Sequence, residues 1–372
     1  MSAKRIYHLD AVRCFCMLFG LMVHGSTIGS GWLFDGIKDI SEHFRMAAFF
    51  LVSGYFSAMV ASRQPLGDFL RNRSRLVLVP LAAGLLLLNP LTNWLIHWFH
   101  GNPMTAGEWL DGGWRLPVNP PAQSNWHLHL WFLFSLFAYA LLTPALLAGG
   151  RGLLKLRPVA WLMEDRAATP FALALATGAA TVLLRALHDQ ILHLPQGHPM
   201  HFIAMATLVH LPFFTLGLLA YIHRGLYESL HRLPLIALAF FAIAYWAQLT
   251  YGAQLPWVLE RASYFMARAG FMLMIVITLL ALARRLVTSG SPALKMLTDS
   301  VYSFYIFHFL AIYLIAVIAQ QFTTNLYLIF AIILLVGYPA LLALHTQVIA
   351  RSRFLLWLWN GKPLAPARAP AS

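Results

Sequence analysis

Long apolar stretches separated by short polar ones recur along the whole chain. Each of about ten such stretches contains roughly 20 residues, the length that an α-helix needs to cross a bilayer. We expect membrane-spanning helices at approximately residues 11–30, 44–62, 76–99, 127–149, 168–188, 203–222, 233–251, 263–283, 297–320 and 326–349. The pattern therefore predicts an all-α, polytopic membrane protein.

Composition agrees with this class, because 60% of the residues are hydrophobic and only 10% are charged. The net charge of +13 does not indicate nucleic-acid binding, since the basic residues lie in the short connections between spans. Cys14 and Cys16 lie inside the first span, so we expect neither a disulfide framework nor a cysteine metal site. The partner that the composition implies is membrane lipid.

The basic residues also predict an orientation. Most of the 26 Lys and Arg residues fall on one side of the predicted spans, and the connections on the other side hold only Lys38, Arg115 and Arg261. An excess of Lys and Arg marks the cytoplasmic side. We therefore expect a multi-pass protein of the bacterial inner membrane with both termini in the cytoplasm. Residues 1–354 would form the membrane domain, and 355–372 a disordered basic tail.

The first span carries three ionisable side chains, Asp10, Arg13 and His24. At about 100° per residue, Arg13 and His24 differ by roughly 20° around a helix, and Asp10 and His24 by roughly 40°. All three share one stripe, which must face protein or water because exposure to lipid is unfavourable. Asp10 and Arg13 could also form a simple i,i+3 ion pair.

Other polar side chains near the spans have both a structural and a functional interpretation. Arg45 could extend to the membrane interface, pair with a nearby carboxylate, or bind substrate. We interpret residues 71–75 as a cytoplasmic loop, in which Arg71, Arg73 and Arg75 either set topology or bind phosphates. His308 in the ninth span is either a structural hydrogen-bonding residue or a substrate contact.

Motifs for several other chemistries do not occur. The chain has no P-loop, GxGxxG, GxSxG or HExxH pattern, and the spacing of His127 and His129 directs their rings apart on a helix, so we predict no metal site. Intramembrane charges also occur in transporters, but we find no inverted repeat and no paired broken helices. Transport is therefore the less favoured functional hypothesis.

Several segments resemble the membrane-bound acyltransferase-3 family. They are Leu9-Asp10 followed by Arg13, ten residues and His24; Phe44-Arg45-Met46; the run 49–57; residues 129–133; and Tyr305-Ile306-Phe307-His308. The resemblance implies an acyl donor on coenzyme A, an acceptor hydroxyl outside the cytoplasm, and no tightly bound cofactor. It implies that His24 is catalytic and that donor or substrate contacts come from Asp10, Arg13, Arg45, Arg71, Arg73, Arg75, Trp131, Tyr305 and His308.

A narrower likeness, which includes the late Asn-Gly-Lys-Pro segment at 360–363, implies succinylation of osmoregulated periplasmic glucans, with glucan-synthesising proteins as candidate partners. Acetylation of another envelope polysaccharide is the alternative. We expect His24 to act as a general base on a glucose hydroxyl, and an acyl-histidine intermediate is also possible. Tyr302, Tyr305 and His308 are candidate oxyanion donors, and Arg45 is the candidate partner for a succinyl carboxylate.

Overall fold

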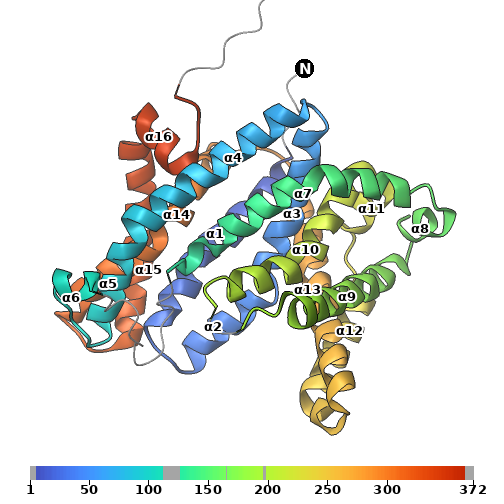
Figure 1. Ribbon diagram of the computed structural model, residues 1–372, viewed down its shortest axis with the longest axis horizontal. Coiled ribbons are helices and arrows are strands. Elements are labelled where there is room, and N and C mark those ends of the chain that lie inside the picture. The colour runs from blue at the N-terminus through green and yellow to red at the C-terminus, as the bar shows by residue number, and fades with distance from the viewer. Residues whose placement is uncertain (1–5, 112–125, 165, 196–197, 365–372) are drawn as a thin grey trace, which may run out of the picture. The chain divides into compact units, whose positions relative to one another are not determined.

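The computed structural model describes residues 6–111, 126–164, 166–195 and 198–364, and every regular element within them is helical (Figure 1). The α-helices are α1 (Tyr7–Gly25), α2 (Trp32–Glu42), α3 (Arg45–Ala61), α4 (Leu66–Ala83), α5 (Asn89–Phe99), α6 (Ala106–Leu110), α7 (Trp131–Leu153), α8 (Arg157–Leu162), α9 (Thr169–Leu187), α10 (His201–Ile222), α11 (Arg224–Ser229), α12 (Leu235–Tyr251), α13 (Trp257–Leu286), α14 (Pro292–Gln320), α15 (Leu326–Ala343) and α16 (Arg353–Asn360). Short 3₁₀ turns are η1 (Ser26–Ile28), η4 (Leu128–Leu130) and η6 (Gly252–Gln254), and π-helical turns are η2 (Gly84–Leu88), η5 (His188–Leu192) and η7 (Leu344–Ile349).

Within the described ranges, ten helical stretches are long and apolar enough to cross a membrane. Each overlaps one predicted span, so the all-α, multi-pass class and the order of the spans are confirmed. The ends differ by a few residues, and most of the helices extend further into the connections than the hydrophobic pattern alone indicates.

The connection expected after the first span is itself helical. Residues 32–42 form α2, in which Phe34, Ile37 and Ser41 are buried. These positions are spaced by three and four residues, so they share one face of the helix. Our prediction of a simple outer loop here was wrong, because this face gains enough burial to hold a polar segment in a helix.

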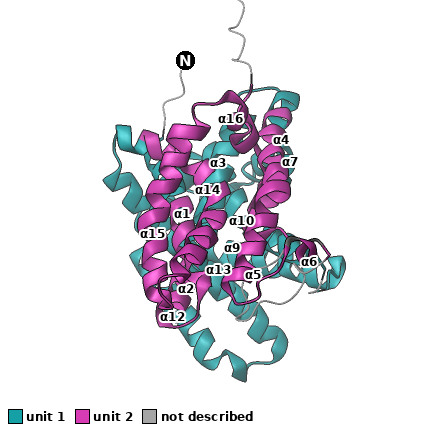
Figure 2. Cartoon of the chain, turned by 90° about the vertical axis from the view of Figure 1, so that its left-hand side faces the viewer, with its two compact units in different colours: residues 1–16, 42–70, 138–294 teal, residues 17–41, 71–137, 295–372 magenta. Residues whose placement is uncertain are grey.

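The structure consists of two compact units, each of which combines distant stretches of the chain (Figure 2). Unit 1 contains residues 1–16, 42–70 and 138–294, and unit 2 contains residues 17–41, 71–137 and 295–372. In unit 1, α10 packs against α3 and α9, and α13 packs against α9 and α12.

Glycine permits a very close approach of α3 and α10 in unit 1. A Cβ added at Gly54 would lie 2.0 Å from the Phe214 carbonyl oxygen, and one added at Gly217 would lie 1.8 Å from the Leu51 carbonyl oxygen. Both distances are far inside van der Waals contact, so neither position has room for a side chain. Small residues bring membrane helices together in this way, where dispersion rather than hydrophobic transfer drives packing.

Unit 2 contains an apolar core built from α1, η1, α2, α5, α14 and α15 together with Leu128. Its large, fully buried members include Phe309 and Tyr313 of α14. The site described below lies beside this core.

The C-terminal stretch that we expected to be a disordered tail from residue 355 begins with α16 (Arg353–Asn360), whose Trp359 and Asn360 are buried. The rest of the expected tail, 365–372, lies outside the described residues.

Substituting Gly217→Ala should lower the free energy of unfolding by roughly 1–3 kcal/mol, because the added methyl group must push α3 and α10 apart. Thermal unfolding of the purified protein in detergent measures this change. The matched control is Gly149→Ala, since a Cβ at Gly149 in α7 meets no atom within 4 Å. Equal melting temperatures for the two variants would contradict the proposed close packing.

Candidate active site

Three buried histidines from distant parts of the chain meet in unit 2. His24 lies in the last turn of α1, His129 in η4 and His308 in α14, and each is at most 6% exposed. The ring centroids of His129 and His308 are 4.7 Å apart, those of His24 and His308 5.1 Å, and those of His24 and His129 6.2 Å. We call these three residues the histidine cluster.

Phe309 forms one wall of the histidine cluster. Its ring is stacked on His129 with centroids 5.3 Å apart and planes 4° apart, and its centroid is 4.9 Å from that of His24. Phe309 is fully buried in the core of unit 2. The cluster therefore borders an apolar, close-packed region that limits the movement of two of its rings.

An unusual backbone conformation places His129. The preceding residue, Leu128, has a φ of 45°, which is in the left-handed region that a leucine rarely adopts. The Tyr305 hydroxyl then donates a hydrogen bond of 2.9 Å to the His129 carbonyl. Burial of Leu128 in the core offsets the cost of its backbone conformation.

The backbone of α14 determines the tautomer of His308. Its Nδ1 lies 2.7 Å from the Tyr305 carbonyl and 3.1 Å from the Phe304 carbonyl. Because a carbonyl oxygen can only accept, Nδ1 must carry the proton. In neutral His308 the proton-accepting atom is therefore Nε2.

Hydrogen bonds also secure the end of α1. The Thr27 hydroxyl donates to the His24 carbonyl at 2.6 Å and lies 3.0 Å from the Tyr313 hydroxyl. The last turn of a helix carries partial negative charge, which stabilises a cation. His24 lies in this last turn of α1, and the bonds to Thr27 hold its backbone in place.

The three imidazoles of the cluster offer acid–base chemistry. Among the residues that the structure describes, no group of three or more His, Cys, Asp and Glu has the arrangement of a metal site. Two imidazolium rings at these distances would repel each other. A neutral imidazole of the cluster can accept a proton from a reacting group.

The other residues predicted on the first two spans belong to unit 1. Asp10 is 8% exposed, and the Arg13 guanidinium lies 5.6 Å from the centre of the Phe56 ring. Arg45 is the half-buried first residue of α3. Glu42, which we considered as a partner for Arg45, accepts a 2.8 Å hydrogen bond from Arg268.

We predicted a loop at residues 71–75, and this was wrong, because these residues are part of α4. Helical periodicity brings Arg71 and Arg75 within roughly 40° of each other and directs Arg73 to the opposite side. Arg71 is exposed, and Arg75 is half-buried. The three arginines appeared equivalent in the sequence. In the helix, Arg71 and Arg75 share one face of α4, and Arg73 lies on the opposite face.

Tyr302 and Tyr305, the candidate oxyanion donors, both donate their hydroxyl hydrogen bonds to backbone carbonyls. Tyr305 donates to the His129 carbonyl, as described above, and Tyr302 donates to the Leu76 carbonyl at 2.8 Å. Neither offers its proton to an oxyanion in this conformation, so our expectation for them needs correction. Trp131, also predicted from the sequence, is the half-buried first residue of α7.

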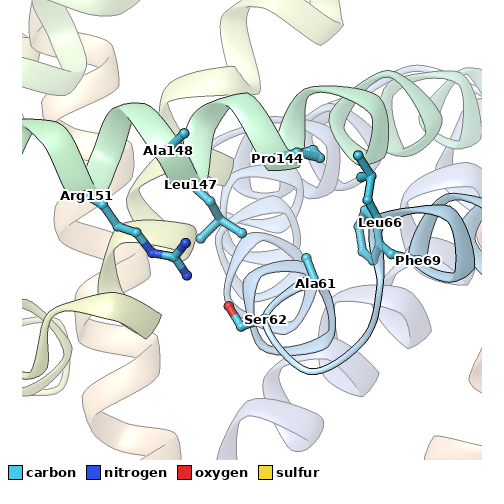
Figure 3. Close-up of a pocket in the computed structure, with 8 residues that line it drawn as sticks. All are labelled: Ala61, Ser62, Leu66, Phe69, Pro144, Leu147, Ala148 and Arg151. Atoms are coloured by element: carbon cyan, nitrogen blue, oxygen red, sulfur yellow. The ribbon is translucent and has the colours of Figure 1, made fainter.

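A cavity of about 320 Å³ lies within unit 1, and Figure 3 shows Arg151 extending into it from α7. The lining residues are Ala61, Ser62, Leu66, Phe69, Pro144, Leu147, Ala148 and Arg151. None of them can act as a general base near neutral pH. The cavity therefore lacks the group that acyl transfer to a hydroxyl requires.

His129 is the member of the cluster that sequence reasoning missed as a site residue. It stands in the segment 129–133 that resembles the acyltransferase-3 family, but we chose Trp131 from that segment. The pair His127 and His129 was considered only as a metal site, and the helical spacing argument dismissed both. The positive φ of Leu128, which directs His129 toward α14, is not indicated by the residue types around it.

Comparisons with known proteins identify the family of the chain. The acyltransferase-3 family model, described as an acyltransferase domain, matches residues 6–344. Glucans biosynthesis protein C of Escherichia coli O139:H28 is 28% identical over 402 aligned residues, with 99% of both chains covered. The protein of the same name from Salmonella schwarzengrund is 27% identical, with 98% of this chain and 96% of the relative covered.

No solved structure matches the chain. The family match spans nine-tenths of the chain and includes all three residues of the histidine cluster. The chain therefore belongs to the acyltransferase-3 family and is a multi-pass membrane acyltransferase.

Proposed function

We propose that this protein is an inner-membrane O-succinyltransferase. It moves a succinyl group from cytoplasmic succinyl-CoA to glucose hydroxyls of osmoregulated periplasmic glucans. The single observation that carries the catalytic part is the buried histidine cluster, in which the ring centroids of His308 and His129 lie 5.1 and 6.2 Å from that of His24.

In the proposed reaction His24 removes the proton from an acceptor hydroxyl, whose oxygen attacks the thioester carbonyl carbon. The C–S bond breaks, the sulfur leaves as the thiolate of coenzyme A, and the imidazolium of His24 returns its proton to that sulfur. The products are a sugar ester and free coenzyme A. The dipole of α1 stabilises the imidazolium between these steps, and Nε2 of His308 offers a second place for the proton.

Arginines are suited to the phosphates of the donor, because the guanidinium fork matches phosphate geometry. The helical positions of Arg71 and Arg75 favour joint contact with one phosphate group. Asp10 and Arg13 remain candidate donor contacts, as the family resemblance implies.

The choice of acceptor rests on the names of the relatives, which refer to glucan biosynthesis. Trp131, which follows His129 after one residue, offers an aromatic face of the kind that sugar rings stack on. A succinyl group ends in a carboxylate that requires a cation, and Arg45 is the proposed partner. Acetylation of another envelope polysaccharide is the alternative that the experiments below distinguish.

Substituting His24→Ala should lower the rate of transfer by roughly 10²–10⁴-fold, since it removes the general base. The measurement uses purified protein, labelled succinyl-CoA and glucan, with mass spectrometry of the glycan to identify the added group. The matched control is His193→Asn, which replaces an exposed histidine with a residue that tolerates its φ of 47°. Full transfer by a folded His24→Ala protein would refute the catalytic assignment.

Substituting Arg71→Met or Arg75→Met should raise the KM for succinyl-CoA, because each removes a charge from the pair proposed to bind phosphate. Arg73→Met should leave this KM unchanged, since Arg73 projects from the opposite side of α4. Initial rates over a range of donor concentrations give both parameters. If all three substitutions have the same effect, the pairing is wrong and the arginines act only through overall charge.

Substituting Arg45→Met should reduce transfer from succinyl-CoA more than transfer from acetyl-CoA, because only the succinyl group carries a carboxylate. The ratio of kcat/KM for the two donors reports this preference directly. An equal loss for both donors indicates a structural role for Arg45. A wild-type protein that uses only acetyl-CoA supports the alternative activity.

A further inference from the structure

Capping hydrogen bonds define both ends of helix α16. The Ser352 hydroxyl accepts a 3.3 Å hydrogen bond from the Leu355 N–H at its beginning. At its end, Gly361 has a φ of 62°, and the Lys362 N–H donates to the Leu356 carbonyl at 3.2 Å. The Gly361 N–H also donates to the Trp357 carbonyl at 2.9 Å, which is the 5→1 bond of the αL C-cap motif. The helix lies beyond residue 344, where the family match ends.

The end of α16 is anchored to α14 and to η7 within unit 2. The Ser303 hydroxyl donates to Oδ1 of Asn360 at 3.1 Å and also lies 2.8 Å from Nδ1 of His345. All three residues are at most 5% exposed. A buried network of this kind is costly to break, because each lost partner leaves a desolvated polar group.

Gly361 contacts the backbone of α4 directly. A Cβ at this position would lie 2.4 Å from the Leu76 Cα and 2.5 Å from the Arg75 carbonyl oxygen. The Gly361 carbonyl accepts a 3.0 Å hydrogen bond from Nε of Arg75, and Nη2 of Arg75 donates to Oδ1 of Asn72 at 3.1 Å. Only glycine fits here, both for its positive φ and for the missing side chain.

The guanidinium of Arg75 is therefore held from two sides, and one of them is the C-terminal turn. The same turn is attached to Ser303 of α14, the helix that carries His308. Tyr302 of α14 donates to the Leu76 carbonyl, which joins α14 to the same turn of α4. The C-terminal turn thus links the helix with the donor arginines to a helix of the histidine cluster.

We propose that the turn formed by Asn360 and Gly361 is a positioning element of the acyl-donor site. It orients Arg75 toward the phosphates of the donor, so that donor recognition depends on a segment outside the family match. The inference rests on the proposed function in one respect, namely that Arg75 binds the donor.

Gly361→Ala tests this inference. The variant should raise the KM for succinyl-CoA about tenfold, the effect expected for losing one hydrogen bond to a charged group. Its kcat and its KM for the glucan should stay within about twofold of the wild type, because the histidine cluster is untouched. Gly67→Ala is the matched control, since Gly67 is an exposed glycine of the same helix α4 with no atom within 4 Å of an added Cβ.

A double-mutant cycle separates positioning from general destabilisation. In the Arg75→Met background, Gly361→Ala should raise the donor KM no further, because the group that it positions is gone. Independent, additive effects of the two substitutions would overturn the inference. If Gly361→Ala does not fold, Asn360→Ala takes its place in the same cycle, with an expected rise in donor KM of about threefold.

Binding of free coenzyme A, measured by calorimetry, provides a readout that needs no turnover. Weaker binding by Gly361→Ala with unchanged binding by Gly67→Ala supports the inference, and equal binding by both overturns it. Failure of the proposed function appears differently: the wild-type protein would neither bind coenzyme A nor transfer an acyl group from it.

Discussion

Polar side chains within a membrane-spanning segment need partners that hydrocarbon cannot supply, and this requirement governs the site. Three imidazoles are buried next to the apolar core of unit 2. The rings of His24 and His129 pack against Phe309, and backbone carbonyls of α14 accept a hydrogen bond from Nδ1 of His308. The carbonyl of Tyr305 binds Nδ1 of His308, while the hydroxyl of the same residue binds the carbonyl of His129. One residue thus positions two members of the cluster, and its own polar groups are satisfied at the same time.

Departures from regular α-helix in unit 2 coincide with polar residues that need a particular direction. The turn η4 carries His129, and η7 carries His345, which contacts Ser303. The turn η2 leads into Asn89, whose side-chain amide donates to the Trp126 carbonyl at 2.8 Å just before η4. A π or 3₁₀ turn rotates the following side chains relative to a regular helix, so it can aim a residue that helical periodicity would direct elsewhere.

The arginines of α4 show how a local sequence pattern can predict a loop where the structure has a helix. The stretch 71–75 is polar and precedes an apolar run, which is typical of a loop before a span. In the structure the helix begins earlier, at Leu66, with Asp68 in its first turn, where a carboxylate is favoured by the helix dipole. Tertiary contact with the Gly361 carbonyl and with Tyr302 gives this polar turn partners that the sequence pattern does not display.

Hydrophobic length and helical spacing were sufficient to predict the membrane class, the ten spans and the placement of Asp10, Arg13 and His24 on one helix. The orientation of the termini remains a prediction from the basic residues. Tertiary packing brings His129 and His308 to His24, and it places the Gly361 carbonyl against Arg75. These residues lie more than a hundred positions apart, and helical periodicity defines only which residues share a face, not which helix that face meets.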